Sequence, residues 1–323
     1  MASLAIAFQL PLLLFRRQTK SDRKSHHTRD RNERPRLCNY DELPDWYRLS
    51  ESPYILTHYR PPSNSCQTSI QSLFLYLHNE TMNTWTHLLP ALVLALALPL
   101  LQFHISRIYA EAPWIDRFML TLSPMAALIT FSLSATYHTL NNHSPFVSSS
   151  CLLMDFGGIL VLILCSFVSA IYMGFYNFPF ERRLYWTMIG VLIATSALLV
   201  LHPRLQGMKY RTHRTSAFVL TVLSGFGPTF HGMYIHGVSK GFHECGIKWW
   251  LAEGFCYAVG VVFFVSRFPE RWAWSSTPGA DGVWFKRSRF DVFGGSHQIF
   301  HICVVLGAAC HCFGVWETWK FAV

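Results

Sequence analysis

The stretch CLLMDFGGILVLILCSFVSAIYMGF, residues 151–175, decides the fold class. It exceeds the roughly 20 residues that a helix needs to cross the hydrocarbon core of a bilayer. Its only charged side chain is Asp155. Backbone amides inside lipid must be satisfied within the segment, and a run of this length is too long for a β-barrel strand. The stretch therefore predicts a transmembrane α-helix.

Six further apolar runs have a similar length, at residues 84–106, 117–138, 184–202, 215–237, 248–266 and 297–317. The composition agrees, since 51% of the 323 residues are hydrophobic and only 14% are charged. A soluble domain is about 25% charged. We therefore predict an all-α membrane protein whose seven transmembrane helices occupy a domain at residues 83–323.

The basic residues lie between the apolar runs and give a net charge of +9. This distribution is typical of a membrane protein and argues against a nucleic-acid partner. Lys286, Arg287 and Arg289, just before the last run, give the best local indication of orientation. We predict a cytoplasmic N-terminus and a C-terminus outside. The sequons at Asn79 and Asn142 should then carry no glycan.

The N-terminal part is predicted to form two regions. Residues 1–39 are expected to be a disordered basic tail, whose initial apolar piece is too short to span a bilayer. Residues 40–82 are expected to be a cytoplasmic segment before the membrane. Within it, SIQSLFLYLHNE (69–80) predicts a short amphipathic helix at the membrane surface before the first span. The nine cysteines are scattered without a C-x-x-C pair, so no disulfide framework or thiolate metal site is expected.

Several polar residues interrupt the apolar runs, where ionisable groups usually mark function because they are costly to place. Singly, His138 is typical of an interfacial histidine, and Asp155 of a hydrogen bond between helices. Because successive spans alternate in direction, His138, Asp155, His297 and His301 should all lie in one layer near the inner face. His297 and His301 are four residues apart, so they share a helix face and could chelate a metal.

Three imidazoles with an open coordination position suit a catalytic zinc ion (Zn²⁺). Imidazole also suits copper, iron or nickel, but zinc is preferred for its availability. Asp155 could be a fourth ligand or, as we prefer, hold the water as general base. Ser134 would support the site from outside the ligands. An H-E-x-x-H protease has a Glu where this chain has Gln298, so Asp155 would have to supply the base. Among the other membrane histidines, His231, His236 and His311 are expected to lie outside the site. His87 begins the first span at the inner face, in the layer of the site, but no residue pairs with it in the sequence.

The chain resembles the progestin and adipoQ receptor family, which includes adiponectin receptors, fungal zinc-homeostasis membrane proteins and haemolysin III-like proteins. The similar motifs run in order from about residue 41 to 301: DELPDWY, YILTHYRPP, HNETMNTWTHL, SATYHTL, MDFGGI and GGSHQIFH. The basic tail and seven runs are most similar to the fungal-type members. The loop NNHSPFVSSS (141–150) departs from the pattern, because it lacks basic residues.

The resemblance implies a seven-helix fold with a cytoplasmic N-terminus and a zinc site near the inner leaflet. It implies metal ligands at His138, His297 and His301, with Ser134 and Asp155 at the family's Ser and Asp positions. Family members are described as receptors, as regulators of lipid and zinc metabolism and, in some cases, as amide hydrolases acting on ceramide.

Three functions compete. The first is a zinc-dependent hydrolase of a ceramide-like lipid amide, involved in lipid and zinc homeostasis. The alternative is a receptor or sensor in which zinc is purely structural. A metal transporter ranks last, because no second row of polar residues continues across the fourth to sixth runs. The expected partner is a membrane lipid or lipid-like ligand, and the expected location is the plasma membrane or the endoplasmic reticulum. The oligomeric state is left open.

Overall fold

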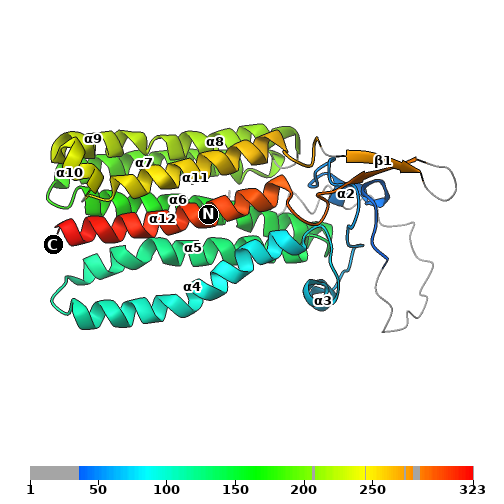
Figure 1. Cartoon of the computed structure of the whole chain (residues 1–323), viewed down its shortest axis with the longest axis horizontal. Coiled ribbons are helices and arrows are strands. Elements are labelled where there is room, and N and C mark those ends of the chain that lie inside the picture. The colour runs from blue at the N-terminus through cyan, green and yellow to red at the C-terminus, as the bar shows by residue number, and fades with distance from the viewer. Residues whose placement is uncertain (1–35, 206–207, 244, 273, 279–283, 323) are drawn as a thin grey trace, which may run out of the picture.

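The computed structural model describes residues 36–205, 208–243, 245–272, 274–278 and 284–322. These residues form an elongated bundle of helices with a cap of shorter elements at one end (Figure 1). The first 35 residues of the predicted basic tail lie outside the described part of the chain.

Six helices among the described residues are long and apolar enough to cross a membrane. They are α4 (Thr81–Ile108), α5 (Trp114–Leu140), α6 (Pro145–Gly174), α7 (Pro179–Val200), α11 (Ile247–Ser266) and α12 (Ser296–Ala322). Each contains one of the predicted apolar runs or coincides with most of it, so the prediction of a helical membrane protein is confirmed.

The fifth predicted run, residues 215–237, does not form one continuous helix. It is divided between α8 (Arg211–Leu223) and α9 (Phe226–His236), with the short α10 (Val238–His243) after them. The break falls at Ser224 and Gly225, just before Gly227 and Pro228. Proline has no N–H to donate to the residue four positions earlier, and this favours a break at such a point.

The cap contains η1 (Tyr40–Glu42), α2 (Asp45–Arg48), α3 (Cys66–Leu75) and an antiparallel hairpin, with the turns η2 (Pro203–Leu205) and η3 (Met208–Tyr210) elsewhere in the chain. The short helix predicted before the first span is α3, which buries Ser69 and Ser72 and exposes Phe74. The hairpin strands β1 (Trp274–Pro278) and β2 (Trp284–Ser288) depart from the all-α prediction. Their aromatic and Thr residues favour extended backbone.

Arg60 fixes the cap to the end of α5 that carries His138. Its side chain is 0% exposed and donates hydrogen bonds to the carbonyls of His138 and Thr139, at 2.7 and 2.9 Å. It also bonds Asn141 Oδ1 at 2.7 Å and Ser72 Oγ at 2.9 Å. A buried guanidinium is tolerated when acceptors surround it, and the last carbonyls of a helix are favourable acceptors for a cation. The segment before the membrane is therefore held against the bundle.

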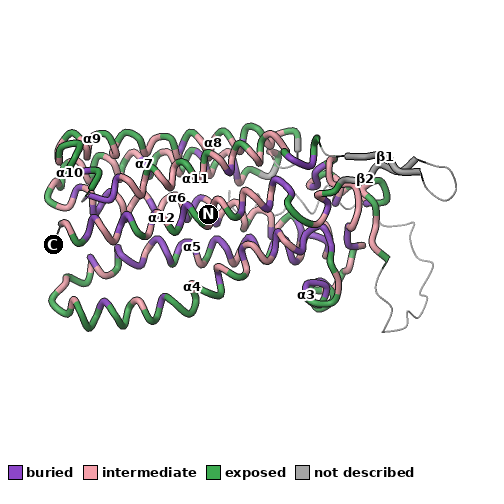
Figure 2. The backbone as a smooth tube through the Cα atoms, viewed as in Figure 1, coloured by how far each residue is buried: buried purple, intermediate pink, exposed green. Residues whose placement is uncertain are grey.

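Close packing of α5 against α6 positions two of the predicted site residues. A Cβ on Gly158 would lie 3.2 Å from the Thr130 Cα, so only a small residue fits at this crossing. The Thr130 hydroxyl donates to the Gly158 carbonyl at 2.7 Å. Because the helices run in opposite directions, Ser134 on α5 comes opposite Asp155 on α6. Figure 2 shows that α5 is the most buried of these helices, whereas α4 is exposed along much of its length.

Candidate metal site

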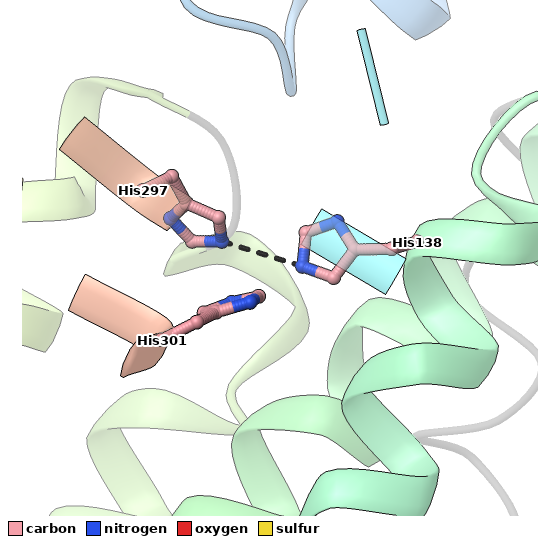
Figure 3. Close-up of side chains that lie close together, drawn as sticks. All are labelled: His138, His297 and His301. Carbon is pink, nitrogen blue, oxygen red and sulfur yellow. Dashed lines mark hydrogen bonds between the residues drawn. The ribbon is translucent and has the colours of Figure 1, made fainter. Parts of the chain in front are cut away.

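Three histidines converge at the cap end of the bundle (Figure 3). His138 comes from the last turn of α5, and His297 and His301 from the first turns of α12. One ring nitrogen of each lies within 4.8 Å of the other two, and the Nε2 atoms of His138 and His297 are 3.3 Å apart. The structure therefore brings together the three residues predicted as metal ligands.

The outer ring nitrogens of two of these histidines contact acceptors. His138 Nδ1 lies 2.6 Å from Glu80 Oε2. His301 Nδ1 lies 3.1 Å from the Asn83 carbonyl and 3.0 Å from Thr86 Oγ1. A carboxylate or carbonyl can only accept, so Nδ1 carries the proton in both rings and Nε2 keeps a lone pair. Metal-binding histidines are typically held in this way.

The histidine nitrogens fit a divalent metal. A tetrahedral zinc ion with Zn–N distances of about 2.0–2.1 Å places its ligand nitrogens about 3.3–3.4 Å apart. The 3.3 Å separation between His138 and His297 agrees with this spacing. Converging lone pairs repel unless a proton or cation lies between them. The arrangement could therefore hold a metal ion, and an all-imidazole donor set suits zinc as well as copper, iron or nickel.

Glu80 is a residue of the site that the sequence analysis did not assign. It directly precedes α4, is 5% exposed, and accepts hydrogen bonds from Asn79 Nδ2 at 3.0 Å and Asn83 Nδ2 at 2.8 Å. The sequence did contain a signal for this residue. Glu80 is an acid just before the first apolar run, in the layer predicted for the histidines.

Ser134 and Asp155 lie together near the three histidines. Their side chains are hydrogen-bonded to each other, and both line the cavity that the histidines also line. Ser134 is 2% exposed and is therefore buried next to the carboxylate. The serine is therefore placed to orient the carboxylate.

His87, which begins the first span in the layer of the site, lies beside the three histidines. Its ring stacks on His301, with centroids 3.8 Å apart, and on Phe131 at 4.9 Å. The residue is 4% exposed and lines the cavity, and neither ring nitrogen has a partner among the described residues. The other three histidines form hydrogen-bond contacts away from the site. His231 contacts the Tyr185 hydroxyl, His236 contacts the Gly174 carbonyl, and His311 contacts the Glu253 carboxylate.

A cavity of about 1160 Å³ extends from this site along the bundle. At the cap end it is lined by Glu51, Ser52 and the histidines, and at the other end by Gly174, His236 and Ile247. The walls between are largely apolar and come from α5, α6, α8, α9, α11 and α12, for example Leu162, Phe167, Val219, Val262 and Val304. The histidine cluster therefore opens into a long apolar cavity rather than into a shallow surface pocket.

Comparison with known proteins agrees with this architecture. The family model described as "Haemolysin-III related" matches residues 75–312. The chain is 32% identical to the "ADIPOR-like receptor IZH2" of Saccharomyces cerevisiae, over 88% of this chain and 84% of that protein. It is 31% identical to the "ADIPOR-like receptor IZH1" of Eremothecium gossypii, over 85% of this chain and 82% of that protein.

It is also 30% identical to the "Adiponectin receptor protein" of Drosophila melanogaster, over 89% of this chain but only 61% of that longer protein. The family match covers five of the six candidate spanning helices in full, the first part of α12 and the three converging histidines. The chain is therefore a multi-pass membrane protein that belongs to the haemolysin-III-related family, together with the progestin and adipoQ receptors.

Proposed function

We propose that this protein is a zinc-dependent membrane hydrolase of lipid amides related to ceramide, active in lipid and zinc homeostasis. One observation carries the proposal: a three-histidine cluster, with a carboxylate nearby, opens into an apolar cavity that runs along the bundle. The cluster provides ligands for a metal, and the cavity provides space for hydrocarbon chains.

His138, His297 and His301 would hold the zinc ion. When bound, zinc supplies a polarised substrate carbonyl and an acidified water molecule, whose pKa falls to about 7. Asp155 would hold that water, accept its proton, and deliver the proton to the leaving nitrogen of the amide. Ser134 would keep the carboxylate of Asp155 in the required orientation through their hydrogen bond. The Glu80 carboxylate would keep the His138 ring in its binding tautomer.

The cavity suits a lipid better than a small polar substrate. Its volume of about 1160 Å³ is slightly larger than the upper end of ordinary ligand pockets, about 1000 Å³. Apolar walls stabilise bound hydrocarbon at about 25 cal/mol for each Å² removed from water. An amide at the histidine end would therefore leave its chain extended toward the far end of the bundle.

The transmembrane arrangement is part of the proposal. Together, α8 and α9 would form one further span, the fifth along the chain, which is interrupted at Gly225. The seven spans would leave the N-terminus in the cytoplasm and the C-terminus outside. Epitope tags at the two ends of the chain test this in intact cells expressing the protein. An antibody should reach the C-terminal tag without permeabilisation when the protein is in the plasma membrane. Labelling of the N-terminal tag under those conditions would reverse the proposed orientation.

A sensor with a structural metal is the second candidate. The relatives compared above carry receptor names, and Arg60 ties the cap to the backbone carbonyl of His138. A change in the metal cluster would therefore reach the cap through a single side chain. In this role Asp155 would matter for stability but not for any reaction.

Ceramide hydrolysis by the purified protein, with metal content measured on the same sample, separates the two candidates. Wild type and Asp155→Ala should both contain zinc, and only wild type should release sphingoid base. The expected decrease in rate for the variant is about 100-fold to 10,000-fold, the usual contribution of a general base. Zinc in both proteins without release from either would favour the sensor.

A further inference from the structure

A second buried polar cluster lies deeper in the bundle. His311 on α12 is 3% exposed, and its Nδ1 lies 2.8 Å from Glu253 Oε2 on α11. Its Nε2 lies 3.3 Å from Ser169 Oγ on α6. The Tyr257 hydroxyl also bonds the Glu253 carboxylate. Three helices therefore meet at one carboxylate and one imidazole.

The donors of this cluster are already in use. The proton on His311 Nδ1 and the Tyr257 hydroxyl proton both point to Glu253, and His311 Nε2 faces Ser169. Ser169 in turn donates to the Cys165 carbonyl at 2.9 Å. An ionised carboxylate has about four lone-pair positions and accepts only. Glu253 therefore retains capacity to accept a further hydrogen bond.

The cluster faces the same cavity as the metal site. Glu253, Tyr257 and His311 all line it. His311 follows His301 by ten residues on one helix, which separates the two positions by about 15 Å along the axis. Placing an ionisable pair inside a membrane-spanning helix costs free energy, so such a pair usually has a function. If its function were only to hold two helices together, the pair would not need to line the cavity.

A second ion pair on the same two helices provides a contrast. Lys248 Nζ on α11 lies 2.6 Å from Glu317 Oε1 on α12. This pair also joins α11 to α12, but neither residue lines the cavity. Helix pairing alone can therefore be achieved away from the chamber, and the placement of Glu253 and His311 needs another reason.

We infer that Glu253, held by His311 and Tyr257, is a binding site for a hydroxyl group carried part-way along a lipid chain. The hydroxyl would donate to the carboxylate about 15 Å from the metal site. A hydroxyl buried in an apolar chamber without a partner is unfavourable, so this acceptor would select hydroxylated chains over plain ones. The inference rests on the proposed function only for the direction of entry, with the amide end at the histidines.

Two fatty amides that differ only in a mid-chain hydroxyl provide the test: ricinoleamide, which has it, and oleamide, which lacks it. Binding of each is measured by calorimetry to purified full-length protein in lipid nanodiscs. An Asp155→Ala background keeps the ligands intact. We expect ricinoleamide to bind about tenfold more tightly than oleamide, which corresponds to a difference in binding free energy of about 1.4 kcal/mol. This is close to the lower end of the contribution of a hydrogen bond to a charged group.

Two paired replacements locate the preference. The variant with Glu253→Leu and His311→Leu removes the carboxylate and the imidazole together and should bind the two amides equally. The matched variant with Lys248→Met and Glu317→Met alters the pair outside the cavity and should keep the tenfold preference. Glu253→Gln is the second test of the site, because it keeps the side-chain shape; a neutral acceptor should reduce the preference to about threefold.

Each other outcome has a distinct meaning. Equal affinity of the Asp155→Ala protein for both amides would overturn the hydroxyl site. A preference that survives both Leu replacements, or disappears equally in the Lys248 and Glu317 variant, would overturn it as well. Failure of both amides to bind would contradict the lipid amide substrate class together with this site. A clear preference, in combination with no product release by the protein that retains Asp155, would contradict only the hydrolase.

Discussion

Two histidine clusters share helix α12 and differ in which nitrogens are in use. At the cap end, the Nδ1 atoms of His138 and His301 contact protein acceptors, and the Nε2 atoms of His138 and His297 approach to 3.3 Å. Deeper in the bundle, both nitrogens of His311 face protein oxygens. The first cluster presents lone pairs to a shared point, and the second presents a carboxylate.

This difference teaches how histidines within a membrane can be distinguished. Burial does not separate the clusters, since His301 is 2% exposed and His311 is 3% exposed. The contacts of the two ring nitrogens do separate the clusters. An imidazole that donates its Nδ1 proton to a protein acceptor can still bind a metal through Nε2. An imidazole whose two nitrogens both contact protein oxygens has no nitrogen left for a metal, and it can only orient the side chains that it contacts.

Removal of a converging imidazole should have the largest effect. The apparent binding free energy of structural zinc is about 10–16 kcal/mol, so one of three ligands contributes about 4 kcal/mol, or about 1000-fold in affinity. His301→Ala should therefore lose zinc in competition with a metal buffer, as followed by elemental analysis of the purified protein. His311→Gln is the matched control and should retain it. Equal zinc in both variants would remove the distinction between the clusters.

The deeper cluster should respond to the loss of one partner more than to the loss of both. His311→Leu alone leaves the Glu253 carboxylate buried without its partner, which should decrease the free energy of unfolding by about 3 kcal/mol. The variant with Glu253→Leu and His311→Leu should be within about 1 kcal/mol of wild type. Denaturant unfolding in detergent measures both. Equal losses in the single and double variants would indicate that the charge on Glu253 is compensated elsewhere.

The role of Glu80 is tested by a neutral replacement. Glu80→Gln keeps the shape but weakens the contact with His138 Nδ1, so zinc affinity should decrease by about 10-fold to 100-fold. Competition with a fluorescent zinc chelator measures this change.

The control is Glu51→Gln. Glu51 is 8% exposed, lines the same cavity and bonds Asn141, and burial raises its pKa well above its usual value. Its carboxyl oxygen accepts a hydrogen bond from Asn141 and not from a candidate metal ligand, so replacement by Gln should leave zinc affinity unchanged. If both Gln variants bind zinc as wild type does, Glu80 does not support the metal ligand.

His78, a buried histidine outside both clusters, should give the smallest effect. His78 is 0% exposed, its Nδ1 accepts the Glu80 N–H at 3.2 Å, and burial and then Arg60 lower its pKa to about 2. The folded state keeps this ring neutral, whereas the unfolded chain protonates it below its ordinary pKa of about 6.5. Stability should therefore be complete above pH 6.5 and decrease as the pH falls toward 2.

One pH unit below 6.5 corresponds to about 1.4 kcal/mol. His78→Gln should remove this part of the decrease between pH 7.5 and 5.5, measured by thermal unfolding at each pH. An unchanged pH dependence in the variant would assign the acid sensitivity to another group.

Local features of the sequence were enough to predict most of the spanning helices. Hydrophobic length is a property of each segment alone, so the runs that became α4, α5, α6, α7, α11 and α12 were recognisable without tertiary contacts. The set His138, His297 and His301 was also predictable. Alternation of span direction placed these residues in one layer, and the spacing of four placed two on one helix face.

Only the tertiary structure decided which faces of the helices meet. The contact between Glu80 and His138, the stacking of His87 on His301 and the pairing of Glu253 with His311 all depend on how each helix is rotated about its axis. Hydropathy does not specify that rotation, because lipid and protein interior are equally apolar. The sequence by itself thus determined six candidate spans and the three histidines that converge, whereas packing between helices determined the cavity and the contacts of each histidine.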